Sequence, residues 1–237
     1  MKRFYKEVTL DTLSEGFGVF LDGRPLRTPA KTVMSVPSKR LAKAVQEEWA
    51  SAGEDIKPEE MPFFSMAVTV LDRVTTQSET LCGELCDYAG NDVLFYRAGA
   101  EDNALDQQQA QLWTPWCEWA SGKFGAQLAI TNGLMPINQP PQWRGAVSGY
   151  LGQLSDWHLG ILYRAVTLSG SFILGLAFFE REIDAAKLFR IAFLEELHQN
   201  EIWGLDSEAE RRQKQIEQEL TDLERFSVML KTSIKLE

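Results

Sequence analysis

Three polar residues, Asp92, Tyr96 and Arg97, follow an expected helix stop and surround a short apolar run. A carboxylate, a phenol and a guanidinium gathered in one place could bind or polarise a small substrate, which makes the cluster a candidate enzymatic site. The alternative is structural, with Asp92 capping a helix and Tyr96 buried with its hydroxyl satisfied. The residues alone leave both interpretations open.

Glu196 and Gln199 lie one helical turn apart in an otherwise apolar helical pattern. A carboxylate and an amide at this spacing on an exposed ridge would suit recognition of backbone groups or of an arginine on another protein. The alternative is a solvated helix face. The pair is therefore a candidate partner-binding site.

Arg24 and Arg27 stand just beyond Asp22-Gly23, a dipeptide typical of a tight hairpin turn. Pro25 and Pro29 accompany the two arginines, fix the backbone and remove donors, which suits an edge or a turn. We expect a stiff, basic, exposed element that could contact a partner, or else a solvated hairpin tip.

The sequence offers no good catalytic centre. The adjacent carboxylates Glu195-Glu196 need not share one acid–base site, because neighbouring helical residues point about 100° apart. The two histidines lie 40 residues apart, and neither has a second His or a Cys at helical spacing, so a zinc site is not expected. The three cysteines do not form a disulfide framework, which fits a reducing compartment. We predict no catalytic residues, no cofactor and no metal.

Charge is unevenly distributed along the 237 residues. The net charge is −10, which argues against general nucleic-acid binding. Residues 1–45 nevertheless hold 9 Lys/Arg and only 4 Asp/Glu, so a basic head precedes an acidic body. The most apolar run, 166–179, is shorter than a membrane span and contains Ser and Gly, which predicts a buried central helix and no membrane insertion.

The patterning predicts short strands first and helices afterwards. Strands are expected at 4–10, 16–21, 24–28 and 32–36, followed by a helix capped by Ser38 and stopped by Gly53. Further helices are expected at 63–76, 79–89 and 105–123, the last kinked or restarted by Pro115, with a short strand at 126–131. Asp184 should cap a helix over 185–203 closed by Gly204, and Ser207 should cap the last helix.

These elements predict an α+β protein, with a small β-rich N-terminal domain followed by a larger α-helical domain. We place the first domain, which includes one helix, at residues 1–62 and the second at 63–237. Aromatic residues at helical spacing normally bury, so four tryptophans are expected in the core: Trp113, Trp116, Trp119 and Trp203.

Five stretches, in fixed order, resemble the assembly chaperone of the F-type ATP synthase that guards the alpha subunit of the catalytic head. They are Leu21-Asp-Gly-Arg-Pro-Leu-Arg-Thr-Pro29; Val36-Pro37 with Glu47-Glu48-Trp49; Met61-Pro62; Asp92 through Tyr96-Arg97-Ala98 with Trp113-Thr-Pro115 and Trp119-Ala120; and Glu195-Glu196, Gln199 and Trp203-Gly204. The sequence departs from the family at Phe95, often Cys or apolar there, and at Leu197, which interrupts an acidic triplet.

The resemblance implies a binding protein without turnover. Its partner would be the free alpha subunit, whose interface with the beta subunit it masks against aggregation until the beta subunit takes its place. We predict partner-binding residues at Glu196, Gln199, Arg24, Arg27, Asp92 and Arg97. For Glu196, the resemblance implies a functionally important carboxylate in the segment before Gln-x-x-x-Trp-Gly. A small-molecule enzyme built on Asp92, Tyr96 and Arg97 and a generic protein–protein adaptor remain as alternatives.

The amino terminus, Met1-Lys-Arg-Phe-Tyr-Lys, carries no targeting features. We therefore expect a cytoplasmic protein if the source is bacterial, or a protein of the mitochondrial matrix if the chain is a processed form. The sequence does not indicate whether the chain associates with itself.

Overall fold

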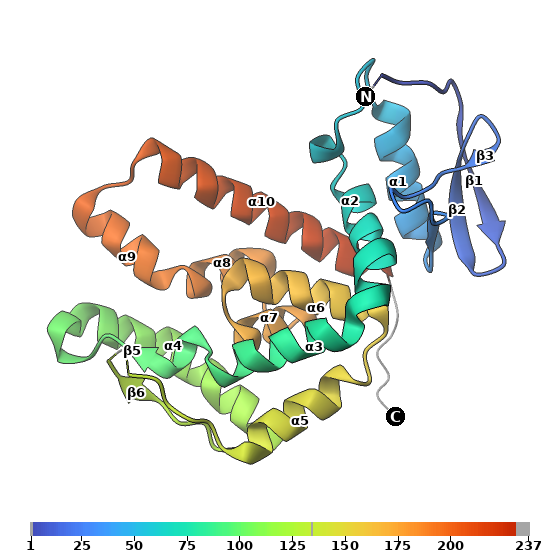
Figure 1. Ribbon diagram of the computed structural model, residues 1–237. Coiled ribbons are helices and arrows are strands. Elements are labelled where there is room, and N and C mark those ends of the chain that lie inside the picture. Colours follow the sequence, from blue (N-terminus) through green and yellow to red (C-terminus); the bar gives the residue numbers. More distant parts are fainter. Residues whose placement is uncertain (1, 134, 231–237) are drawn as a thin grey trace. The chain divides into compact units, whose positions relative to one another are not determined.

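The computed structural model describes residues 2–133 and 135–230 (Figure 1). The fold class is confirmed: a small strand region at the N-terminus precedes a larger helical part. Contacts between residues group the chain into two compact units. The first comprises the described residues of Met1–Gln77 and Asp222–Glu237, and the second comprises Ser78–Thr221. The expected boundary at residue 62 stays a prediction. By these contacts, residues 63–77 and the end of the last helix group with the strands.

The first unit is built on a four-stranded antiparallel sheet in which β2 (Gly16–Leu21) pairs with each of the other strands. Its neighbours are β1 (Val8–Leu13), β3 (Arg24–Pro25) and β4 (Ser35–Val36). The expected turn is confirmed, since Asp22 and Gly23 both take positive φ angles of 48° and 77°. The Asp22 carboxylate accepts hydrogen bonds from the backbone of Lys6 and Glu7, which lower its pKa.

Two of the expected strands are shorter than predicted, and the first begins later. The runs 24–28 and 32–36 reduce to two-residue strands and one isolated bridge between Arg27 and Val33. Proline cannot donate to a ladder, and Pro25 and Pro29 interrupt the pairing there. The first strand begins at Val8 rather than Phe4.

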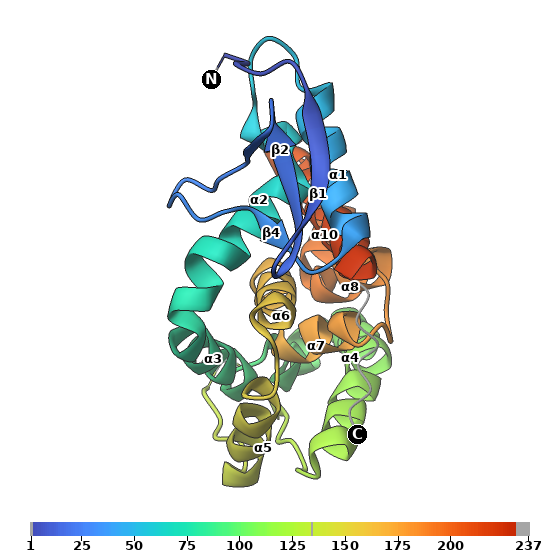
Figure 2. The same ribbon diagram turned by 90° about the vertical axis from the view of Figure 1, so that its right-hand side faces the viewer.

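Helix α1 (Lys39–Ser51) lies alongside β1 and β2 (Figure 2), and Ser38 caps it as predicted. Glu48 on α1 accepts hydrogen bonds from the backbone nitrogens of Phe63 and Phe64 at 2.7 and 2.8 Å. The two nitrogens lie at the start of α2 (Pro62–Thr69), where backbone donors have no partner within the helix. Helix α2 follows the short turn η1 (Pro58–Glu60). A side chain of one helix therefore caps another, with Trp49 packed edge-on against Phe64 at 5.0 Å.

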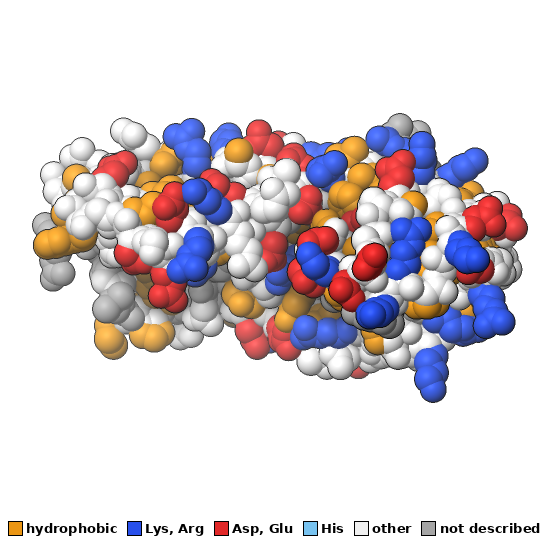
Figure 3. Space-filling view, turned by 90° about the horizontal axis from the view of Figure 1, so that it is seen from above, with side chains coloured by type: hydrophobic (Ala, Val, Ile, Leu, Met, Phe, Trp, Pro, Cys, Tyr) orange, Lys and Arg blue, Asp and Glu red, His pale blue; other side chains and the backbone are white. Residues whose placement is uncertain are grey.

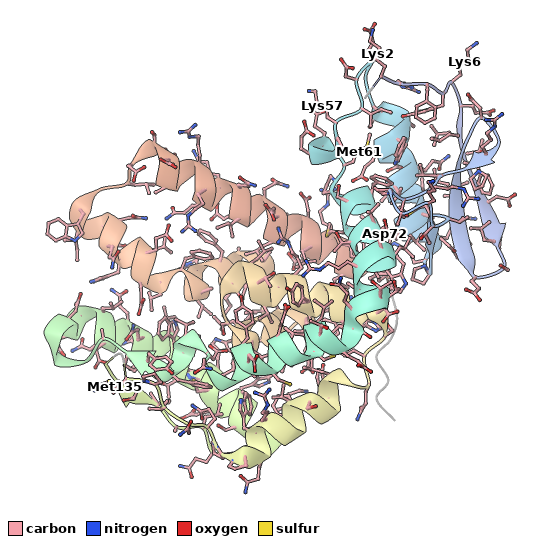
Figure 4. All side chains as sticks on the ribbon, viewed as in Figure 1. Lys2, Lys6, Lys57, Met61, Asp72 and Met135 are labelled. Carbon is pink, nitrogen blue, oxygen red and sulfur yellow. The ribbon has the colours of Figure 1, made fainter. Side chains whose placement is uncertain are left out.

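The α2 helix continues through a π-helical turn, η2 (Val70–Val74), into α3 (Thr75–Gly90). Gln77 has non-helical angles, so the break expected between 76 and 79 is present as a kink. Asp72 of η2, labelled in Figure 4, accepts hydrogen bonds from the Thr28 hydroxyl at 2.7 Å and the Ala30 backbone at 3.1 Å. The basic loop after β3 is thereby fixed to a helix of its own unit.

The second unit surrounds a short apolar helix, α7 (Phe172–Phe179), whose eight residues are all buried. It packs against α4 (Asn103–Phe124), α6 (Asp156–Ser169) and α8 (Ala185–Ala192). The run 166–179 is buried as predicted but forms two helices, because Gly170 turns the chain with a φ of 70° and Ser171 caps α7. Gly175 permits close packing, since a Cβ there would lie 2.6 Å from Cγ2 of Val166.

Several elements of the second unit differ from the sequence prediction. Helix α4 runs unbroken through Pro115, so no new segment starts there. The expected strand at 126–131 is only β6 (Thr131–Asn132), which pairs in parallel with β5 (Tyr96–Arg97). The expected helix over 185–203 is two helices, α8 and α9 (Leu194–Trp203), separated at Phe193. The remaining elements are η3 (Val93–Phe95), η4 (Gly99–Asp102) and α5 (Pro141–Leu151).

The last helix, α10 (Ser207–Leu230), buries Leu220, Leu223 and Leu230. Its cap is Asp206 rather than Ser207, because the Asp206 carboxylate accepts from the backbone of Glu208 and Ala209. Asp184 caps α8 and Gly204 ends α9, both as predicted. The three cysteines are free. Within the described ranges, none of the helices is long and apolar enough to cross a bilayer.

Burial of Glu48 predicts a pH effect on stability. Burial raises its pKa from 4.5 to about 7, against the lowering effect of its two backbone donors. The folded protein therefore holds this proton more tightly than the unfolded chain, so the stabilisation is present below about pH 4.5 and is lost as the pH rises through 7. In urea unfolding at several pH values, the free energy of unfolding of Glu48→Gln should fall less with rising pH than that of the wild type, by on the order of 1 to 2 kcal/mol. The exposed neighbour variant Glu47→Gln should keep the wild-type slope. Parallel slopes for all three proteins would contradict the assignment.

Candidate partner-binding site

Asp92 is completely buried and joins the starts of two helices. Its carboxylate accepts hydrogen bonds from the backbone nitrogens of Leu94 and Ile173, at 3.0 and 2.8 Å, and from the Ser171 hydroxyl at 2.8 Å. It thus caps η3 directly and α7 together with Ser171. Burial raises the pKa of Asp92 to about 6, although these donors favour the charged form. The geometry matches the capping interpretation of this residue.

Arg97 is also buried, with 7% of its surface exposed. Its guanidinium donates to the backbone oxygen of Gln109 at 2.8 Å and lies 5.2 Å from the Trp113 ring centroid. Asp92 therefore turns toward α7 and Arg97 toward α4, so the structure does not bring the two together into one pocket. Direct contact of Asp92 and Arg97 with a partner stays a prediction, and their burial disfavours it.

The two hairpin arginines are exposed, as expected for a basic element. Arg27 donates to the backbone oxygen of Lys31 at 2.7 Å, and Arg24 follows directly after the Asp22-Gly23 turn. Figure 3 shows Lys and Arg side chains gathered over the first unit, at the right of that view. A partner-binding role of Arg24 and Arg27 stays a prediction.

Glu196 belongs to α9 and contacts α10 with both carboxylate oxygens. One oxygen pairs with the Arg212 guanidinium, and the other accepts from the Gln213 amide at 2.7 Å. Its side chain is 29% exposed. The sequence anticipated a residue near the edge of the apolar face and free to meet a partner; here the carboxylate holds two successive helices together. A direct partner contact of Glu196 stays a prediction.

Two further polar contacts hold the opposite side of α9. The Gln109 amide of α4 donates to Glu195 at 2.7 Å, and the His198 ring bonds through Nε2 to Asp102 at 3.0 Å. Gln109 is completely buried, and its amide oxygen also accepts from the backbone of Ala98. Arg97, Gln109 and Glu195 thus form one network from β5 through α4 to α9.

The end of α9 exposes apolar side chains. We define the α9 tip as Ile202, Trp203 and Leu205, which are 55%, 84% and 45% exposed. The expectation that Trp203 is a core residue is wrong, because its ring is exposed at the last residue of α9, directly before Gly204, which has a φ of 84°. Trp113 is buried as predicted, whereas Trp116 and Trp119 are half-buried. Gln199, one turn before the tip, is exposed.

A groove of about 840 Å³ runs between α4, α8, α9 and α10. We call it the α9 groove. Its apolar walls include Leu112 of α4, Ile191 of α8, and Leu194 and Leu197 of α9, and Leu205 of the α9 tip contributes to it. His198 and Asn200 also line it, whereas Asp92, Tyr96 and Arg97 do not. The polar cluster therefore does not contribute to this groove.

Sequence reasoning missed the groove and the residues that frame it. Gln109 and Asp102 lie far from α9 in the sequence, and no local pattern predicts their contacts with Glu195 and His198. The signal available was Gly204, since a helix-ending glycine one residue after Trp203 leaves that ring at a helix end. Within the part of the chain that the structure describes, no group of His, Cys, Asp and Glu could hold a metal ion.

Comparison with known proteins decides the family. A family model described as ATP12 chaperone protein matches residues 2–121, half of the sequence. The chain belongs to the ATP12 chaperone family. The resemblance seen in the motifs is therefore confirmed, and with it a chaperone of ATP synthase assembly.

Relatives of this ATP12-family chain extend the match to nearly its whole length. It is 36% identical to Atp12 from Paracoccus denitrificans, whose crystal structure it matches with a TM-score of 0.91, covering 97% of this chain and 98% of that one. It is 24% identical over 214 residues to the mitochondrial protein atp12 of Schizosaccharomyces pombe, covering 86% of this chain and 74% of that protein. The mitochondrial protein ATP12 of Saccharomyces cerevisiae is 25% identical over 247 residues, with 86% and 76% covered.

The capping role of Asp92 predicts a large loss of stability on substitution. Asp92→Ala leaves the buried donors of Leu94, Ile173 and Ser171 without their acceptor, and each such group costs about 1 to 3 kcal/mol. We expect the free energy of unfolding to fall by roughly 3 kcal/mol or more, measured by urea denaturation. Asp184→Ala removes an exposed helix cap and should cost only about 1 kcal/mol. Equal losses in the two variants would contradict the role assigned to Asp92.

The contacts of Glu196 predict a local effect. Glu196→Lys places a cation beside Arg212 and removes the acceptor for Gln213, so α9 should separate from the start of α10 more often. Hydrogen exchange in α9 should accelerate, while global stability falls by only about 1 kcal/mol, as for partly exposed ion pairs. Glu182→Lys, an exposed charge reversal in the same unit, should leave α9 exchange unchanged. Unchanged α9 exchange in Glu196→Lys would show that the contact does not hold the helix.

Proposed function

We propose that this ATP12-family chaperone binds the free alpha subunit of the F-type ATP synthase catalytic head. It covers the surface through which the alpha subunit later meets the beta subunit, and it releases the alpha subunit when the beta subunit competes for that surface. An uncovered apolar subunit interface aggregates, and reversible cover by a third protein prevents this by mass action. Family membership supports the proposal.

The exposed α9 tip is the observation that supports a binding surface at this end of the helix. Trp203 is 84% exposed and stands beside exposed Ile202 and Leu205. Tryptophan is enriched among the residues that dominate protein–protein binding energy, and an exposed apolar cluster commonly marks an interaction site. The tip is carried on a helix held by contacts to α4 and α10, so little order is lost on binding.

We further propose that Gln199 of α9 contributes to this surface and that Glu196 acts by holding α9 in place. Arg24 and Arg27 would supply a second, basic contact from the first unit. Gln199, Arg24 and Arg27 are exposed and present the polar or charged groups that recognition of a protein surface uses.

We also propose that the chain performs no catalytic turnover. Two polar groups of the enzymatic candidate are already engaged: Asp92 caps helices, and Arg97 bonds Gln109. The protein would act in the compartment where the ATP synthase head is assembled, which is the cytoplasm of a bacterium or the mitochondrial matrix. The two yeast relatives are named as mitochondrial proteins, in line with the second location.

Co-expression with the alpha subunit tests the proposal. The wild-type chain should raise the amount of soluble alpha subunit and co-purify with it. Trp203→Ser should weaken this binding at least tenfold, because truncating a central aromatic contact costs about 2 kcal/mol or more. Its folding should change by no more than about 0.5 kcal/mol, since the ring is exposed.

Met135→Ser provides the matched control, because Met135 is also strongly exposed, at 78%, but does not belong to the α9 tip (Figure 4). Its variant should bind the alpha subunit like wild type. Absence of any co-purification with the wild-type chain would disprove the proposed function. Full binding by Trp203→Ser would instead remove the α9 tip from it.

A further inference from the structure

The loop between β3 and β4 presents two neighbouring cations. We define the basic loop as residues 27–32, which project from the sheet of the first unit (Figure 2). Arg27 and Lys31 are both exposed. The Arg27 guanidinium donates to the backbone oxygen of Lys31 at 2.7 Å, which keeps the two residues next to each other.

The backbone of the basic loop is fixed, because each N–H group of residues 28–32 has a partner. The Thr28 nitrogen donates to the Thr32 oxygen at 2.9 Å, and the Thr32 nitrogen donates to the Thr28 hydroxyl oxygen at 3.1 Å. The Lys31 nitrogen donates to the Thr28 oxygen at 2.8 Å. Asp72 accepts from the Ala30 nitrogen and from the Thr28 hydroxyl. A loop held in this way loses little conformational freedom when it binds a partner.

Lys31 adopts a backbone conformation that L side chains rarely adopt. Its φ is 71°, in the left-handed region, where a Cβ atom is unfavourably placed. Glycine would occupy this position without that cost. Backbone conformations of this kind concentrate at functional sites, where a side chain is retained at the expense of stability. The Lys31 side chain is therefore a candidate for function rather than for folding.

The two cations differ from most cations of the second unit in having no carboxylate partner. Among the residues that the structure describes, neither Arg27 nor Lys31 forms an ion pair. In the second unit, by contrast, each of several cations pairs with a carboxylate: Lys123, Arg144, Arg164, Arg212 and Lys214. The charges of the basic loop are therefore available to an acidic group of another molecule.

The size of the basic loop favours an acidic protein surface over a nucleic acid or a membrane. Polyanions of those two kinds are bound by arrays of several cations, and this loop offers two. The net charge of the chain, −10, also opposes binding to a polyanion. Two carboxylates on a folded protein match two neighbouring cations, and the guanidinium of Arg27 suits bidentate contact with a carboxylate. Exposed Pro29 and Ala30 add a small apolar surface between the cations.

We propose that the basic loop binds an acidic patch on the client protein, where Arg27 and Lys31 each contact a carboxylate. Asp72 is a positioning residue that fixes the loop, and Lys31 keeps its unfavourable backbone conformation because its charge is used in binding. The identity of the client as the alpha subunit rests on the proposed function. The loop adds to the α9 tip an electrostatic contact that acts mainly on the rate of association.

Association kinetics of the full chain with the alpha subunit, measured at 50 and 300 mM NaCl, test this proposal. The double variant Arg27→Glu with Lys31→Glu should associate at least tenfold more slowly than wild type at 50 mM NaCl, and its rate should depend less on salt. The double variant Lys39→Glu with Arg40→Glu makes the same charge change at exposed positions of α1. It should change the association rate less than threefold. Thermal melting checks that both variants fold.

Glycine at position 31 separates the use of the side chain from folding. Lys31→Gly should melt at or above the wild-type temperature, because glycine adopts this φ freely, and should bind the alpha subunit at least threefold more weakly. Arg181 is the matched control, since it is an exposed cation of the second unit with a φ of 65°. Arg181→Gly should bind the alpha subunit as wild type does. A lower melting temperature for Lys31→Gly with unchanged binding would make Lys31 structural and overturn its role.

Substitution of Asp72 tests its positioning role. Asp72→Ala leaves both cations in place, but hydrogen exchange of the Ala30 and Lys31 amides should accelerate and association should slow. Asp72→Asn keeps an acceptor for the Thr28 hydroxyl and should associate faster than Asp72→Ala. Equal association rates for wild type and Asp72→Ala would show that the position of the loop does not matter for binding.

A twelve-residue peptide of alternating Asp and Gly tests the charge preference of the loop without the alpha subunit. In an NMR titration at 50 mM NaCl, the side-chain nitrogen signals of Arg27 and Lys31 should shift, and those of Lys39 and Arg40 should shift less. A peptide of alternating Asn and Gly should leave all four signals unchanged. Vesicles with 30% phosphatidylserine should not bind the chain.

The outcomes separate the two proposals. If the wild-type chain binds the alpha subunit and the loop variant associates as fast, or the α1 variant associates as slowly as the loop variant, the loop inference is overturned and the proposed function stands. If the acidic peptide contacts Arg27 and Lys31 while the alpha subunit fails to bind, the loop inference is supported and the proposed function is refuted. Vesicle binding that requires Arg27 and Lys31 would make a membrane the partner and overturn the inference.

Discussion

The candidate site depends on the side-chain contacts that hold α9 against its neighbours. Leu194 and His198 are the buried residues of this short helix, so its own apolar face secures it only in part. Glu195 bonds Gln109, Glu196 bonds Arg212 and Gln213, and His198 bonds Asp102. Hydrogen bonds and an ion pair from polar residues therefore hold α9 in place, whereas apolar packing holds α7. The helix can end in exposed apolar residues and still keep a defined position.

The same contacts link the predicted polar cluster to α9 without placing it at a surface. Arg97 bonds the backbone of Gln109, whose side chain bonds Glu195, and Trp113 donates through Nε1 to the backbone of Ile191 on α8. Asp92 aligns the starts of η3 and α7 at the centre of the unit. Asp92 and Arg97, which the sequence predicts as binding residues, are therefore core residues that support the elements forming the α9 tip and the α9 groove.

Local signals predicted much of this fold, and long-range contacts account for what they missed. The Asp22-Gly23 turn, the caps Ser38 and Asp184 and the stop at Gly204 were all predicted, because each depends on residues within one turn. The break at Phe193 was not, since the apolar pattern continues through it. The partners of Glu195, Glu196 and His198 lie 16 to 96 residues away, beyond any pattern in the sequence. For that reason the sequence names candidate residues, whereas their long-range contacts come from the structure alone.

Hydrogen exchange of the chain with and without saturating alpha subunit tests the central claim most directly. The account predicts that amides from the second half of α9 through the start of α10 become protected when the alpha subunit binds, because the α9 tip is then covered. Protection confined to other segments, or none at all in a complex shown to form, would contradict it.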